Sequence, residues 1–392
     1  MRNEEMRSVQ FGGKVFLRTF VMATTLAAAV MTTLATQAAE PVVFVSSFAD
    51  GEDAAIHAFH FDLAQGKLTP LAKTTGVEHP FFLALSPDQR FLYSIHAKNF
   101  GGKENEEVAA YALEGRTGKL KLLNRQSALG TAACYLQVDA TGKSVLLANY
   151  LTGSVAAYPV KSDGSIGEAA SFVQHVGSSV NPARQKEPHA HCFVTSPDNR
   201  FAFAADLGID QIVSYRLDPQ TAKLTPAPQP FVRTIPGAGP RHLTFHPNGN
   251  AMYVINELLN SVTRFDYDPA TGHLIERQTL STLPKDFEGT SYCADLKITP
   301  NGKFLYGTNR GHDSLAAYRI ADNGDLTLLE IVPSLGKGPQ NLAITPDGKW
   351  LLCANMPGNN LVVFAIDANS GKLAPHGEPI TIPGPSCIQW LK

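Results

Sequence analysis

The sequence predicts an all-β fold, a seven-bladed β-propeller closed by pairing of its N- and C-terminal strands. Three observations predict this fold. One hairpin-forming unit recurs along the chain, each copy is followed by two further short strands, and the two ends of the repeat region each hold part of one more unit. Six complete blades and one split blade together account for residues 42–391.

The repeated unit is a pair of apolar strands joined by a turn such as Pro-Asp or Asn-Gly, which is a hairpin signature. In chain order the copies are PFFLALSPDQRFLYSIHA from Pro80, CYLQVDATGKSVLLANYL from Cys134, CFVTSPDNRFAFAADL from Cys192, RHLTFHPNGNAMYVINEL from Arg241, DLKITPNGKFLYGTNRG from Asp295 and QNLAITPDGKWLLCANM from Gln340. They lie about 50 residues apart, a period that fits a four-stranded propeller blade rather than a helical solenoid.

A third strand, a second turn and a short fourth strand follow each copy, as in SVAAYPV from Ser154 and LVVFAID from Leu361. The seventh unit is split between the two ends of the domain. Residues 42–72 supply strands two to four, and PSCIQWL from Pro385 matches a first strand. Pairing these ends would close the ring and remove both exposed sheet edges.

Residues 1–39 have the layout of a secretory signal peptide. An apolar run at residues 20–35 is preceded by four basic residues, Arg2, Arg7, Lys14 and Arg18. At about 16 residues this run is shorter than the roughly 20 that a spanning helix needs. We expect cleavage near Ala38 or Ala39, a propeller domain of residues 40–392 in the periplasm or outside the cell, and no stable membrane insertion afterwards. A retained anchor is the alternative.

The charge pattern argues against a nucleic-acid partner. Lys and Arg number 33 against 35 Asp and Glu, and no basic run occurs after the N-terminal segment. The five cysteines are odd in number and form no CxxC pair, so we expect buried free thiols, most of them on inner strands. They are Cys134, Cys192, Cys293, Cys353 and Cys387.

The repeat places two sets of residues at one end of the ring, because the first two strands of a blade are antiparallel. The first strands begin with Phe81, Cys134, His191, Arg241, Ala294, Gln340 and Ser386. The second strands end with Ser47, His96, Asn149, Asp206, Asn256, Asn309 and Asn355, followed by Phe48, Ala97, Tyr150, Leu207, Glu257, Arg310 and Met356. Different polar residues fill equivalent slots in successive blades, which indicates a functional site there.

The expected catalytic residues are Glu257, His191, His189, Arg241 and Arg310. Two guanidiniums can hold a carboxylate and stabilise a developing oxyanion, and a carboxylate with an imidazole can transfer protons. Substrate contacts are expected from Asn149, Tyr150, Asn256, Asn309 and Gln340. For the asparagines the alternative is a structural role, because short amides often bind loop backbone.

No metal or cofactor is expected. His189 and His191 are two residues apart on a strand and face the same way, but the spacing marks no third ligand. A calcium site among the axial Asn, Asp and Glu side chains is an alternative. Six further histidines are expected at loop or surface positions, namely His175, His242, His246, His273, His312 and His376. No nucleophile elbow, P-loop or dinucleotide fingerprint occurs.

Four segments carry a family resemblance: PHAHCFVTSPDNRF from Pro188, GPRHLTFHPNG from Gly239, VINEL from Val254 and ADLKITPNGKFLYGTNRGHDS from Ala294. In these segments the chain resembles the seven-bladed lactonase family, which includes 6-phosphogluconolactonases of the propeller type and fungal carboxymuconate-cyclising enzymes. The resemblance covers residues 42–391. It implies a metal-free site built from His189 or His191, Arg241, Glu257 and Arg310.

The chain departs from the resemblance at Gln340, where many members are expected to have Arg, which leaves one positive charge fewer for a phosphate. We therefore expect a monomeric lactonase that hydrolyses a sugar-acid or related carboxylate-bearing lactone. The alternatives are a cycloisomerase that forms a muconolactone-type product and a non-catalytic propeller that binds a ligand or protein. An acid–base pair favours an enzyme, whereas a large apolar patch on that face would favour a binding module.

Overall fold

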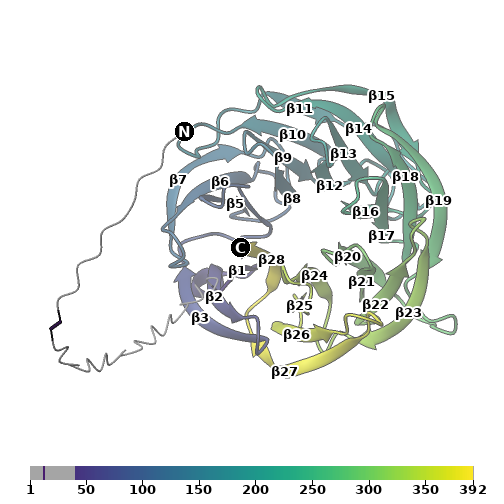
Figure 1. Cartoon of the computed structure of the whole chain (residues 1–392). Coiled ribbons are helices and arrows are strands. Elements are labelled where there is room, and N and C mark those ends of the chain that lie inside the picture. Colours follow the sequence, from purple (N-terminus) through teal and green to yellow (C-terminus); the bar gives the residue numbers. More distant parts are fainter. Residues whose placement is uncertain (1–11, 14–39, 392) are drawn as a thin grey trace, which may run out of the picture. The chain divides into compact units, whose positions relative to one another are not determined.

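Seven antiparallel sheets of four strands follow one another around a ring in residues 40–391 (Figure 1). This computed structural model describes Gly12, Gly13 and residues 40–391, so the expected signal peptide lies outside the described residues apart from those two glycines. The predicted all-β propeller is confirmed. Within the described ranges the single helical element is a 3-10 turn, η1 (Gly51–Asp53), and no helix is long and apolar enough to cross a membrane.

Each blade runs from an innermost first strand to an outermost fourth strand (Figure 1). Blade 1 consists of β4 (Leu83–Leu85), β5 (Phe91–His96), β6 (Glu107–Leu113) and β7 (Leu120–Ser127). Blade 2 consists of β8 (Ala133–Val138), β9 (Ser144–Asn149), β10 (Ser154–Pro159) and β11 (Ser171–Gln174). Blade 3 consists of β12 (Ala190–Thr195), β13 (Phe201–Asp206), β14 (Gln211–Asp218) and β15 (Lys223–Arg233).

Blades 4 to 6 follow the same order. Blade 4 consists of β16 (Pro240–Phe245), β17 (Ala251–Asn256), β18 (Ser261–Asp268) and β19 (His273–Ser281). Blade 5 consists of β20 (Tyr292–Ile298), β21 (Phe304–Arg310), β22 (Ser314–Ile320) and β23 (Leu326–Pro333). Blade 6 consists of β24 (Pro339–Ile344), β25 (Trp350–Asn355), β26 (Asn360–Ile366) and β27 (Leu373–Thr381). Blade 7 consists of β28 (Pro385–Leu391), β1 (Val42–Ser47), β2 (Ala55–Asp62) and β3 (Lys67–Thr74).

The seventh blade is built from both ends of the domain, as predicted. β28 pairs antiparallel with β1, with Val43 opposite Trp390 and Val45 opposite Ile388. β1 pairs in turn with β2, so β28 supplies the first strand that the N-terminal part of this blade lacks. Ile388 and Val45 also pack with Leu352 of blade 6, and this contact ties the closing strand into the core between blades.

The second strand of each blade lies between two neighbouring blades and is fully buried in β9, β13 and β17. Alternate side chains of β13 face opposite neighbours: Phe203 packs with Val254 of blade 4, and Ala204 packs with Leu146 of blade 2. Because both faces of the sheet are covered, the central residues of these strands are continuously apolar rather than alternating. All five cysteines are buried and unpaired, as expected.

A β-bulge interrupts the first strand of every blade except blade 1. In blade 4, Pro240 pairs with Asn256 and His242 with Ile255, so Arg241 is the extra residue. A bulge lets adjacent side chains point to the same side of a sheet. The bulges include the first-strand positions named above, at Cys134, His191, Arg241, Ala294, Gln340 and Ser386.

Candidate active site

Glu257 lies at the centre of three arginines, at the end of the ring where the first strands begin. Its backbone N–H donates to the Gly239 carbonyl at 2.7 Å, which holds it just beyond the end of β17. Its Oε2 accepts hydrogen bonds from Arg241 Nε at 2.9 Å and from Arg310 Nη2 at 2.8 Å. Its Oε1 accepts from Arg184 Nη2 at 2.7 Å.

The charge state of Glu257 follows from this arrangement. Burial disfavours the ionised carboxylate, but the charges of the three guanidiniums outweigh burial and lower the pKa of Glu257 to about 2. Both carboxylate oxygens already accept hydrogen bonds from these guanidiniums. This environment suits a role in orienting the arginines better than the proton-transfer role expected from the sequence.

Arg241 is 1% exposed and sits at the bulge of β16. Its Nη1 donates to His242 Nε2 at 3.1 Å and also to the Ala294 carbonyl. Burial, followed by repulsion from Arg310, lowers the pKa of Arg241 to about 10, so the guanidinium stays charged at neutral pH. Among the described residues no hydrogen-bond partner meets its Nη2, and that amino group can donate to a ligand oxygen.

Arg310 ends β21 and reaches solvent, with its side chain 26% exposed. Its Nη2 also donates to the Cys293 carbonyl at 3.0 Å, and its Nη1 donates to Gln340 Oε1 at 3.3 Å. Gln340 therefore contacts the cluster through the guanidinium of Arg310. Both residues come from the positions that the repeat assigned to this end of the ring.

Arg184 is a member of the site that sequence reasoning missed. It lies in the connection between β11 and β12, residues 175–189, which is the longest connection between two blades. Its Nη2 donates to the Tyr150 hydroxyl at 2.9 Å as well as to Glu257, and its guanidinium lies 5.5 Å from the ring centre of Tyr292. The unusual length of this loop, directly before the PHAH motif, is the signal that could have indicated it.

His189 and His191 both lie against the ring of Tyr150, with ring centres 4.5 and 5.1 Å away. His189 Nδ1 donates to the Tyr150 carbonyl at 2.9 Å, so its Nε2 carries the lone pair. His191 Nδ1 lies 3.5 Å from Cys134 Sγ. Burial, followed by the charge of Arg241, holds the pKa of His191 well below 6.5, so its imidazole is uncharged near neutral pH.

The asparagines at the ends of the second strands are fully buried and bonded within the fold. Asn149 Nδ2 donates to the Ala128 carbonyl, and Asn309 Nδ2 donates to the Thr282 carbonyl. Asn256 Nδ2 donates to hydroxyls of its own blade at 3.0 and 2.9 Å. These contacts support the structural alternative for Asn149, Asn256 and Asn309, and we do not carry them forward as substrate contacts.

One expectation about the other histidines is wrong. His242 is 3% exposed rather than on the surface, because the bulge at Arg241 turns it inward, where its Nδ1 bonds Asp295 Oδ1 at 2.9 Å. His175 lies in the loop after β11, as expected, but is only 6% exposed, with Nδ1 2.6 Å from Asp206 Oδ2 and Nε2 2.8 Å from the Tyr215 hydroxyl. The other four are partly exposed, namely His246, His273, His312 and His376.

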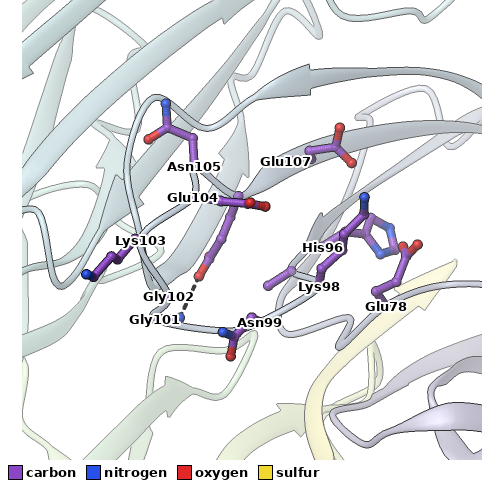
Figure 2. Close-up of a pocket in the computed structure, with 12 residues that line it drawn as sticks. Glu78, His96, Lys98, Asn99, Gly101, Gly102, Lys103, Glu104, Asn105 and Glu107 are labelled. Carbon is purple, nitrogen blue, oxygen red and sulfur yellow. Dashed lines mark hydrogen bonds between the residues drawn. The ribbon is translucent and has the colours of Figure 1, made fainter.

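A separate hollow of about 700 Å³ lies in blade 1, beside the connection between β5 and β6 (Figure 2). Its lining includes Glu78, Glu104 and Glu107 but only two lysines, Lys98 and Lys103. An excess of carboxylates disfavours an anionic ligand there. None of the predicted site residues lines it. Within the described residues no three His, Cys, Asp or Glu side chains are arranged to hold a metal ion.

Comparison with known proteins identifies the family. Residues 42–390 match the family described as "Lactonase, 7-bladed beta-propeller". The chain belongs to this lactonase family. The match covers all seven blades and every residue of the arginine–glutamate cluster, so the family expected from the sequence is confirmed.

Relatives of the lactonase cover nearly its whole propeller. A 6-phosphogluconolactonase of Bacillus subtilis is 33% identical over 350 residues, which is 89% of this chain and 97% of the relative. One from Formosa agariphila is 33% identical over 89% of this chain and 99% of its own length. The solved periplasmic gluconolactonase of Pseudomonas aeruginosa is 31% identical, with a TM-score of 0.85 over 90% of this chain and 99% of that one. The expected enzyme class, a 6-phosphogluconolactonase-like lactonase, is confirmed.

Proposed function

We propose that this lactonase hydrolyses the lactone of a sugar acid or a related carboxylate-bearing lactone at the arginine–glutamate cluster. The observation that carries the proposal is the convergence of Arg184, Arg241 and Arg310 on one buried carboxylate. The uncharged imidazole of His191 lies on blade 3, next to blade 4, which carries Arg241 and Glu257. Burial and the charges of Arg241 and Arg310 lower the pKa of His191. Cationic donors and a neutral base are the two components that opening an ester ring requires.

The proposed reaction begins with attack of water on the lactone carbonyl carbon, while the water proton passes to Nε2 of His191. The Nη2 amino group of Arg241 stabilises the negative charge that develops on the carbonyl oxygen, together with Arg310. When the tetrahedral intermediate collapses, the bond to the ring oxygen breaks and that oxygen takes the proton from His191. The product is a hydroxy acid, which releases the second proton of the water to solvent, and the arginines hold the resulting carboxylate until the product leaves.

The substrate in this proposal carries no phosphate. Position 340 supplies a glutamine carbonyl to Arg310 rather than a further cation. We further propose that residues 1–39 direct export and are removed. The similarity to a periplasmic gluconolactonase supports this location. All proposed residues belong to one chain, so a monomer suffices.

A hydrolysis assay on a lactone panel tests this proposal. The purified protein is given D-glucono-1,5-lactone, its 6-phosphorylated form and a muconolactone, with and without EDTA, and acid release is followed. We expect D-glucono-1,5-lactone to be opened with a higher kcat/KM than the phosphorylated lactone, and EDTA to have no effect. Preference for the phosphorylated lactone would overturn the substrate class, and failure to open any lactone would overturn the activity.

A further inference from the structure

A buried chain of polar groups runs from the candidate site along the first strands of blades 4 and 5. Arg241 Nη1 donates to His242 Nε2, because a guanidinium cannot accept a hydrogen bond. The other ring nitrogen, Nδ1, is therefore the N–H group that donates to Asp295 Oδ1 at 2.9 Å. Lys297 Nζ donates to both carboxylate oxygens of Asp295, at 2.8 and 2.7 Å.

Asp295 is held from three blades. His242 reaches it from blade 4 and Lys297 from its own strand in blade 5, while Asn341 Nδ2 and the backbone N–H of Leu342 donate to it from blade 6 at 2.8 and 2.9 Å. Burial opposes ionisation of Asp295, but the charge of Lys297 and the bond from His242 outweigh it and lower its pKa. The carboxylate is therefore a fixed anion behind the imidazole of His242.

We propose that His242 and Asp295 are positioning residues that hold the Arg241 guanidinium with its Nη2 amino group directed at the substrate. The proposal rests on the proposed function. Glu257 holds Arg241 at Nε, and His242 and the Ala294 carbonyl hold it at Nη1, so rotation of the guanidinium is blocked and Nη2 alone is left for a ligand. A donor fixed in advance needs no reorganisation when charge develops in the transition state.

His242 can play this part only while it is uncharged, because an imidazolium has no lone pair for Arg241. Burial, followed by the charge of Arg241, lowers the pKa of His242 to about 4. The titratable and charged groups that face it are Arg241 on its own strand, Asp295 and Lys297 on β20, His191 on β12 with ring centres 5.6 Å apart, and Tyr135 on β8 with ring centres 5.1 Å apart. Tyr135 is partly buried, and burial raises its pKa.

Two substitutions separate positioning from packing. The amide of H242Q extends far enough to accept from Arg241, whereas the shorter amide of H242N reaches only Asp295. A displaced catalytic group can cost about 100-fold in rate, so we expect kcat for D-glucono-1,5-lactone to fall by about that factor in H242N. We expect H242Q to stay within a few-fold of the unaltered protein, with equal folding of both variants checked by thermal unfolding. H246Q, which alters a partly exposed histidine just after β16, serves as the matched control.

The dependence of kcat on pH distinguishes a positioning role of His242 from a purely structural one, because a purely structural role would leave that dependence unchanged. In the unaltered protein, kcat should fall as the pH drops through about 4, where His242 takes up a proton. In H242Q the part of this fall that comes from His242 should be absent while the part that comes from the general base His191 remains, so the acid limb should become less steep. Equal kcat in H242N and H242Q, or an unchanged acid limb in H242Q, would overturn the proposal.

The hindered rotation of Arg241 is measured without any substrate. With 15N-labelled arginine, a held guanidinium gives separate Nη1 and Nη2 signals, and the spectrum of R241K identifies which signals belong to Arg241. We expect separate signals in the unaltered protein and in H242Q, and one averaged signal in H242N. If the protein opens no lactone, the proposed function fails, but this comparison still decides the inference, since separate signals in H242N would contradict it.

Discussion

The side chains of Arg241 and Glu257 meet across the innermost hairpin of blade 4, where Arg241 Nε donates to Glu257 Oε2 at 2.9 Å. Neither side chain is more than 5% exposed. The hairpin itself brings them together, because Arg241 occupies the bulge of β16 and Glu257 follows the last residue of β17. The pair therefore links the stability of the propeller to the geometry of the candidate site.

Replacement of Glu257 by Gln should destabilise the protein as well as reduce its activity. Three guanidiniums lose their counter-charge, and Arg241 remains buried. Breaking a buried ion pair by removing one partner typically costs about 3–5 kcal/mol, and we expect a loss of that size in the free energy of unfolding at pH 7. Denaturant titration measures it. Glu288→Gln, which removes an exposed carboxylate from the loop before β20, is the matched control and should change little.

The stabilising effect of Glu257 on the folded protein should depend on pH. The pKa of Glu257 is about 2 in the folded protein against an ordinary value of 4.5, so its stabilising contribution is present above pH 4.5 and is lost as the pH falls towards 2. The difference in unfolding free energy between the unaltered protein and Glu257→Gln should therefore shrink over this range. A difference that stays constant from pH 7 to pH 3 would argue against an ionised Glu257.

Replacement of Arg184 by Gln should weaken substrate binding while leaving the fold intact. The side chain is 31% exposed and lies in a loop, so little stability depends on it. Loss of one charge-assisted hydrogen bond is worth about 1.5–3 kcal/mol, and we expect KM to rise at least tenfold with kcat nearly unchanged. Steady-state kinetics measure both. Arg200→Gln in the hairpin between β12 and β13 is the control, and an unchanged KM for Arg184→Gln would remove Arg184 from the site.

Replacement of His191 by Gln should lower kcat by about 10²–10⁴, the usual contribution of a general base. Because the pKa of His191 lies well below 6.5, the base stays unprotonated and kcat should not decline as the pH falls through 6.5. His189→Gln should have a smaller effect, since His189 bonds the Tyr150 carbonyl and lies stacked on that ring. An inactive His189→Gln variant beside an active His191→Gln variant would assign the proton transfer to His189 instead.

Closure of the ring through β28 should be required for cooperative folding. Deleting residues 385–392 removes the strand that pairs with β1 and exposes that edge, and we expect thermal unfolding to lose its single sharp transition. As a milder test, Ile388→Ala empties a site that is 2% exposed and should lower the free energy of unfolding by about 2–5 kcal/mol. Ile275→Ala on β19, where the side chain is 54% exposed, is the matched control. Equal stability of the two alanine variants would contradict this account of closure.

The propeller could be predicted from the sequence because turn residues recur at fixed places in each unit, as in SPDQ before Phe91 and TPDG before Trp350. Each of those turns marks where the first strand ends and the second strand begins. Because the two strands are antiparallel, the start of the first strand and the end of the second lie at the same end of the ring. The pairing of β28 with β1 followed from the same counting. The bulges could not be predicted in this way, because an extra residue in one strand leaves the turn positions unchanged.

The candidate site was predictable only where its residues occupy repeat positions. Arg241, Glu257 and Arg310 occupy such positions, and the structure places them in contact. Arg184 belongs to a connection that is longer than its counterparts between the other blades, so the repeat could not locate it. His242 was misplaced because a regular strand would turn it away from the side that Arg241 faces, whereas the bulge turns both to the same side.

The central claim is that guanidiniums fixed around Glu257 open a lactone, and the most direct measurement is kcat for D-glucono-1,5-lactone in the unaltered protein and in Arg241→Lys. Lysine keeps the charge but loses the planar fork that reaches Glu257, His242 and the substrate together. Loss of one oxyanion donor costs about 10²–10³, so kcat should fall by that factor while the protein remains folded. Full activity in Arg241→Lys would contradict the account.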